Sequence, residues 1–305
     1  MRRSSVRISP SAKDTRFYFE KSEKPKISNR NYLLKRTCLF IIRCLTSKMH
    51  LFKRTFTIKS FTIYNRFIFK NILTVKKIRC IITVLFKKRG RYIMKGFGNV
   101  LIIGDSYSTF KGFNPDGYAY WYPQGGSGNS HTDVKEVSET WWHQLMSETE
   151  SNLILNDSYS GSTICSTERE SMPGTHFNIR TDRMIKNGFF NENRIDTIFV
   201  FGGTNDSWID SPIGEIKYDD ITEDDIRMVL PAFAALIAKL KAASPESRII
   251  PLINSDIKEQ IKDGFEEICC HYELTYIRFE TLDKLSGHPS RQGMEQIKDA
   301  VKNLL

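Results

Sequence analysis

The chain has 305 residues, 40% of them apolar, which suits one large globular domain or two small ones. Its net charge of +10 is unevenly spread: residues 1–93 carry 25 basic and 3 acidic side chains, whereas residues 94–305 carry 20 and 32. The excess of acids argues against nucleic-acid binding by the second segment. The apolar runs of the first segment are too short and interrupted for a membrane span, and the six cysteines lack the paired spacing of a zinc site.

Residues 1–93 form a basic extension with one glycine, at position 90, and no steady period of 2 or 3.6. Three interpretations stay open: an arm that binds nucleic acid or a membrane surface, a disordered extension, or upstream DNA translated from a start codon set too early. We favour the third, because an amino-acid sequence rich in Ile, Phe, Lys and Asn is typical of translated A/T-rich DNA. The functional domain is therefore expected at 94–305, and without an export signal before it the expected location is the cytoplasm.

Residues 94–305 alternate between strand and helix signals. Short apolar runs predict strands at 99–104, 152–157, 194–203, 247–254 and 274–279. Helices are predicted at 138–150, 222–244, 256–272 and 290–305, with Ser138 and Thr222 as caps of the first two. Pro231 is expected to kink its helix, and Pro251 to put its strand at an edge or an irregular step. This alternation predicts a three-layer α/β/α sandwich around a mostly parallel five-stranded sheet.

Small polar residues follow the predicted strands. The first strand leads into Gly104-Asp105-Ser106, the second into the segment 156–161, and the third into the segment 202–206. A Ser-Gly-His-Pro-Ser segment at 286–290 precedes the last helix. Ligands of parallel α/β sheets bind at the carboxyl ends of the strands, so these residues are expected to converge on one site.

The four segments GDSYS, NDSYSGST, GGTND and GHPS, in this order, resemble the blocks of the SGNH hydrolases, also called the GDSL esterase/lipase family. The resemblance covers most of residues 97–305 and implies a flavodoxin-like fold and a serine esterase. It makes Ser106 the nucleophile and His288 the base. It also implies an oxyanion hole built from the backbone N–H groups of Ser106 and Gly161 and the side-chain amide of Asn205. Asp105 receives no role in proton transfer.

The sequence departs from the family pattern beside the histidine. The family usually has an acid three residues before it, where this chain has Leu285. Two alternatives stay open: Asp283 orients His288 from five residues upstream, or a backbone carbonyl or Ser286 supports the ring in a Ser-His dyad.

Aromatic residues suggest the substrate. Trp121, Tyr122 and Trp208 are expected to bind it, because aromatic faces stack on sugar rings or line an acyl pocket. Trp141 and Trp142 either join them or pack their helix on the sheet. We expect a short acyl group such as acetyl, on a carbohydrate or similar carrier, with no metal and no cofactor. The alternatives are a non-catalytic ligand-binding domain and a nucleic-acid-binding protein acting through the basic arm; the oligomeric state stays open.

Overall fold

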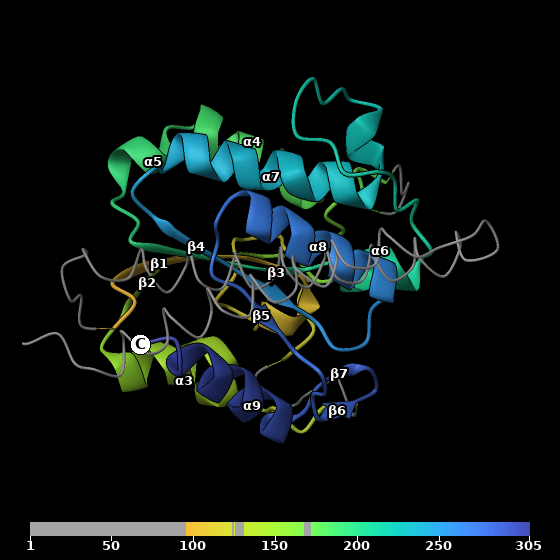
Figure 1. The fold of residues 1–305 in the computed structure, drawn as a ribbon. Helices are drawn as coiled ribbons and strands as arrows, with labels where there is room; N and C mark the ends of the chain where they lie inside the picture. Colours follow the sequence, from red (N-terminus) through yellow and green to blue (C-terminus); the bar gives the residue numbers. More distant parts are fainter. Residues whose placement is uncertain (1–95, 124, 126–130, 168–171) are drawn as a thin grey trace, which may run out of the picture. The chain divides into compact units, whose positions relative to one another are not determined.

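A five-stranded parallel sheet is the centre of the fold (Figure 1). The computed structural model describes residues 96–123, 125, 131–167 and 172–305, so the basic extension and the expected boundary at residue 94 lie outside the described residues. The strands run in the order β2-β1-β3-β4-β5. Their bounds are Asn99–Gly104 for β1, Asn152–Ser158 for β2, Thr197–Gly202 for β3, Arg248–Ile253 for β4 and Ile277–Arg278 for β5. Every adjacent pair is parallel, so the predicted flavodoxin-like sheet is confirmed.

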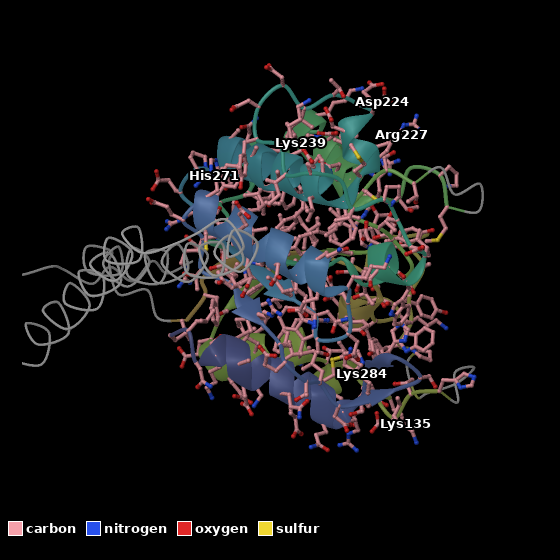
Figure 2. The ribbon with its side chains drawn as sticks, turned by 45° about the vertical axis from the view of Figure 1, so that its right-hand side comes forward. Lys135, Asp224, Arg227, Lys239, His271 and Lys284 are labelled. Carbon is pink, nitrogen blue, oxygen red and sulfur yellow. The ribbon has the colours of Figure 1, made fainter. Side chains whose placement is uncertain are left out.

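Helices cover both faces of the sheet (Figure 1). On one face lie α3 (Trp141–Thr149) and α9 (Arg291–Lys302); on the other lie α4 (Phe177–Lys186), α5 (Phe189–Glu192), α7 (Val229–Ala243) and α8 (Glu259–His271). In Figure 2, Asp224, Arg227 and Lys239 mark the α7 side of the molecule, and Lys135 and Lys284 the α9 side. The three predicted layers are therefore present.

The central strand β1 is buried from both sides, as its unbroken apolar run predicts. Leu101 and Ile103 belong to the core under α4, α7 and α8, whereas Val100 and Ile102 belong to the core under α3 and α9. Successive side chains of a strand point to opposite faces, so one strand supports both layers. Its carboxyl end is consequently fixed by two independent cores.

Three predicted helix starts are wrong: α8 begins at Glu259 instead of residue 256, and the other two have a visible local cause. Residues Val137–Glu139 form a short 3-10 helix, and α3 begins at Trp141 with Thr140 as its cap, accepting from the His143 N–H. The other helix, α7, begins at Val229, after a 3-10 turn over Asp225–Arg227 whose Asp225 carboxylate accepts from the Thr222 N–H and hydroxyl. Pro231 thus lies in the first turn of α7, where a backbone N–H has no helical partner, and it does not interrupt the helix.

The strand β4 explains how Pro251 is tolerated. It pairs along its whole length with β3 but meets β5 only at Leu252 and Ile253, so Pro251 has no partner residue on the β5 side. The expected irregular position is thereby explained. The sequence does not predict the helices α4 and α5, the short helix α6 (Thr204–Trp208), or the hairpin of β6 (Lys284–Leu285) and β7 (His288–Pro289). In the part of the chain that the structure describes, no helix is long and apolar enough to cross a membrane.

Candidate active site

Ser106 stands directly beyond the carboxyl end of β1. The strand ends at Gly104, where a Cβ atom would approach the Ser158 Oγ to 2.5 Å, so a larger residue would displace the Ser158 side chain. Asp105 then caps a 3-10 helix over Ser106–Ser108, with its carboxylate accepting from the Tyr107 N–H at 3.0 Å. Ser106 is 2% exposed. The turn therefore presents the candidate nucleophile from a rigid strand end.

His288 lies within hydrogen-bond distance of Ser106. Its Nε2 is 2.9 Å from the Ser106 Oγ, and its Nδ1 is 3.1 Å from the Ser286 carbonyl oxygen. A carbonyl only accepts, so Nδ1 carries the proton and donates it to Ser286. The lone pair of Nε2 is then available to accept from the Ser106 hydroxyl, which is the geometry of a nucleophile beside a general base.

Burial keeps His288 uncharged. Loss of solvation lowers the pKa of His288 to about 4; the charge of Lys284 acts in the same direction, and the Ser286 carbonyl opposes both. The imidazole is therefore neutral at pH 7 and can take up a proton.

Asp283 does not contact the histidine. Its carboxylate accepts from the Ser290 hydroxyl, its carbonyl oxygen accepts from the Ser290 N–H at 3.1 Å, and its own N–H donates to Gln296 at 2.8 Å. Ser290 in turn caps α9. The carboxylate thus stabilises the start of α9, and the geometry of the first alternative, a triad with Asp283, is absent. The Nδ1 partner is the carbonyl of Ser286, which corresponds to the second alternative.

Two tyrosine hydroxyls hold the backbone on either side of His288. Tyr107 donates to the Gly287 carbonyl at 2.6 Å, and Tyr122 donates to the Pro289 carbonyl at 2.9 Å. Tyr122 is 0% exposed and belongs to the core under α3 and α9. The expectation that Tyr122 binds substrate is therefore wrong, because its ring is packed and its hydroxyl is committed to the histidine loop.

Two tryptophans surround the imidazole. The ring of Trp121 stacks on His288 with centroids 3.5 Å apart and planes 8° apart. Trp208 meets the same ring edge-on, with centroids 5.7 Å apart and planes 80° apart, and remains 49% exposed. The structure thus places both at the site. Trp141 and Trp142 are buried instead, and their indole N–H groups donate to the Ser108 Oγ at 3.2 Å and the Ser108 carbonyl at 3.0 Å.

The three expected oxyanion donors follow three neighbouring strands. Ser106 follows β1, Gly161 follows β2, and Asn205 lies in the first turn of α6 after β3. Gly161 has a φ of +84°, a conformation that favours glycine. The Asn205 Nδ2 donates to the Ser162 carbonyl at 2.9 Å, which ties the third donor to the loop of the second. An amide nitrogen carries two protons, so a second one is available to a substrate oxygen.

Sequence reasoning missed Arg180, which braces these strand ends from α4. It is 1% exposed and donates to the carbonyl and carboxylate of Asp157, to the Gly104 carbonyl at 3.0 Å and to the Ser162 Oγ at 3.2 Å. Its charge is paired with Asp157, as a buried ion requires. The signal was hidden because the helix that carries Arg180 was not predicted.

Asp206 provides a second missed brace. Its carboxylate accepts from the Ile164 N–H at 3.1 and 2.9 Å and from the Cys165 N–H at 3.0 Å, which fixes the loop after Gly161. Among the residues described, no three His, Cys, Asp or Glu side chains gather as a metal site.

The parallel sheet in flavodoxin order, with a Ser-His pair at its carboxyl edge, is the architecture of an SGNH-type ester hydrolase. Comparison with known families supports this class: the GDSL-like lipase/acylhydrolase model matches residues 98–305. The chain belongs to this family.

Two solved structures from Bacteroides are similar to this chain. One, from Bacteroides uniformis ATCC 8492, is 41% identical over 69% of this chain and 96% of its own length, with a TM-score of 0.60. The other, from Bacteroides ovatus ATCC 8483, is 38% identical over 68% of this chain and 98% of its own, also with a TM-score of 0.60. Both are assigned to the GDSL-like lipases. A search of curated proteins finds no match.

Proposed function

We propose that the domain is a serine esterase that hydrolyses short acyl esters through an acyl-enzyme intermediate. The observation that carries the proposal is the 2.9 Å contact between the Ser106 Oγ and the His288 Nε2, combined with the carbonyl that fixes the proton on Nδ1. Together they supply a nucleophile and an adjacent, uncharged base.

In the first half of the reaction, Ser106 Oγ attacks the ester carbonyl carbon while His288 Nε2 takes the hydroxyl proton. The oxyanion receives hydrogen bonds from the N–H groups of Ser106 and Gly161 and from the Asn205 amide. The tetrahedral intermediate collapses, the bond to the alcohol oxygen breaks, and the imidazolium gives its proton to that oxygen. The alcohol leaves and the acyl group remains on Ser106.

In the second half, water attacks the acyl carbon and gives a proton to His288. Collapse of this second intermediate breaks the bond to Ser106, whose oxygen recovers the proton from the imidazolium. The carboxylic acid leaves. No step needs a metal or a cofactor.

The aromatic surroundings support a short acyl group on a carbohydrate or similar polar carrier. Trp208 is half exposed beside His288, and Tyr120, next to Trp121 in the chain, is 43% exposed. The exposed ring of Trp208, beside the proposed base, suits the apolar face of a sugar ring. The close cover of His288 by Trp121 leaves little room for a long chain beside the base.

A p-nitrophenyl ester series tests the reaction and the acyl length. We expect hydrolysis of the acetate at a higher kcat/KM than the octanoate, and loss of both activities in Ser106→Ala. Acetylated cello- and xylo-oligosaccharides test the carrier. An inactive wild-type protein that still binds oligosaccharides would instead support a non-catalytic binding domain.

A further inference from the structure

The flat contact between Trp121 and His288 is unlike the other aromatic contacts of the site. With centroids 3.5 Å apart and planes 8° apart, the indole covers one whole face of the imidazole. Tyr107 meets the same ring only at 5.5 Å and 56°, and Trp208 meets it edge-on. One face of the base is therefore occupied by Trp121, so that face is closed to substrate.

The backbone of Trp121 is fixed relative to both members of the Ser-His pair. Its N–H donates to the Thr109 hydroxyl at 2.9 Å, and that hydroxyl donates to the Ser106 carbonyl at 2.9 Å. The next residue, Tyr122, donates through its hydroxyl to the Pro289 carbonyl, beside His288. The indole is thus held over the imidazole by hydrogen bonds that start from the nucleophile on one side and from the histidine loop on the other.

The described groups around His288 provide no negative charge to stabilise its protonated form, and the indole of Trp121 can supply that stabilisation. When His288 takes the Ser106 proton, an imidazolium forms in a buried site. Asp283, which the sequence offers as one of two alternatives for stabilising it, faces Ser290, and the cation Lys284 acts against the charge. The polar partner of Nδ1 is a neutral carbonyl. The face of an indole carries negative potential and attracts a cation.

We propose that Trp121 is a positioning residue, whose indole face fixes the plane of His288 and stabilises its imidazolium in place of the carboxylate of a Ser-His-Asp triad. The inference rests on the proposed esterase function and assigns Trp121 a role other than substrate binding. Thr109 helps to position Trp121, because its hydroxyl links the Trp121 N–H to the carbonyl of Ser106.

Substitutions separate this role from packing and from substrate binding. With p-nitrophenyl acetate, we expect Trp121→Leu to lower kcat by about three- to thirtyfold with KM little changed, and Trp121→Phe to retain most of the kcat, because phenylalanine keeps an aromatic face. Trp208→Leu is the matched comparison, expected to raise KM while kcat changes little. Equal losses in Trp121→Leu and Trp121→Phe, or a kcat within twofold of wild type in Trp121→Leu, would overturn the proposal.

Fluorinated tryptophan tests the same point without a change of shape. Fluorine withdraws electron density from the ring face and weakens its attraction for a cation. We expect 5-fluorotryptophan throughout the protein to lower kcat by about twofold, and to leave the kcat of Trp121→Phe unchanged. Equal effects in the two proteins would contradict the role of Trp121. The fluorotryptophan experiment remains decisive if Trp121→Leu fails to fold.

An NMR measurement distinguishes failure of this inference from failure of the proposed esterase function. The ring protons of His288, assigned by their loss in His288→Gln, should be shifted upfield by the stacked indole at pH 7.5 and should move downfield in Trp121→Phe and Trp121→Leu. Their titration should give a His288 pKa that falls in the order Trp, Phe, Leu. An equal or higher pKa in Trp121→Leu refutes the stabilising role even in a protein that hydrolyses no ester.

Discussion

The two halves of the site are held in different ways. Ser106 is positioned by the main chain: it follows a central strand paired on both sides, and the N–H of Asp105 donates to the Phe201 carbonyl of β3 at 3.2 Å. His288 is positioned by side chains: it sits on a two-residue strand and depends on the Tyr107 and Tyr122 hydroxyls and the Trp121 ring.

Because of this difference, effects on stability and effects on catalysis can be measured separately at His288 but not at Ser106. The supports of Ser106 belong to the sheet, so changing them alters the fold as well as the activity. Apart from the Ser286 carbonyl, the supports of His288 are two hydroxyl groups and a ring face, which can be removed one at a time. The histidine, the proposed base, is therefore the half of the site in which positioning can be measured.

The largest expected effect comes from removing either half of the pair. Ser106→Ala and His288→Gln should each lower kcat for p-nitrophenyl acetate by about 10⁴-fold or more, because each leaves the other without its partner. The double variant should be no worse than the single ones. A His288→Gln protein with more than one-hundredth of the wild-type kcat would show that another base serves Ser106.

The second-largest effect is expected when a side chain that supports the His288 loop loses its hydroxyl. Tyr107→Phe removes the hydroxyl that donates to Gly287 and accepts from Asn254, and should lower kcat by about tenfold, the effect of one buried hydrogen bond. Tyr272→Phe, at the end of α8 in the opposite layer, is the control and should stay within about twofold of wild type. Equal kcat values in wild type and Tyr107→Phe would show that the hydroxyl does not position the base.

A smaller effect is expected at Asp283. Asp283→Ala should lower kcat by less than about threefold, because its carboxylate faces Ser290, and should lower the free energy of unfolding by about 1 kcal/mol through the start of α9. Steady-state kinetics and urea denaturation measure the two quantities. A tenfold loss of kcat in a normally stable protein would return Asp283 to the role of orienting acid.

The smallest effect is the change of activity on mild acidification. Because burial lowers the pKa of His288 to about 4, the neutral base persists as the pH falls, and kcat/KM should drop by less than about a quarter between pH 7 and pH 5. An unperturbed histidine would lose most of its activity over this range. Burial also raises the pKa of Asp105 to about 7, so the profile must be repeated in Asp105→Asn. An acid limb near pH 6.5 in that variant would contradict the prediction.

The sequence predicts the sheet well because buried parallel strands are short apolar runs, two of which, β1 (Asn99–Gly104) and β3 (Thr197–Gly202), end in glycine. Its local motifs single out Ser106 and His288, whose Oγ and Nε2 atoms the structure brings within 2.9 Å of each other. It misplaces Tyr122, because a core residue and a substrate-binding aromatic residue are alike in sequence. The partner of Asp283 and the stacking of Trp121 depend on contacts with residues far along the chain, and no local pattern encodes such geometry.

The contacts of Ser108 have a consequence for folding. This residue, two places after the nucleophile, accepts both indole N–H groups of α3, and its carbonyl also accepts from the Asn156 side chain of β2 at 2.7 Å. The nucleophile turn therefore gains its final hydrogen bonds only after α3 has docked on the sheet. Backbone structure can form before α3 docks. The rate at which ester hydrolysis returns during refolding therefore reports the rate of that docking step.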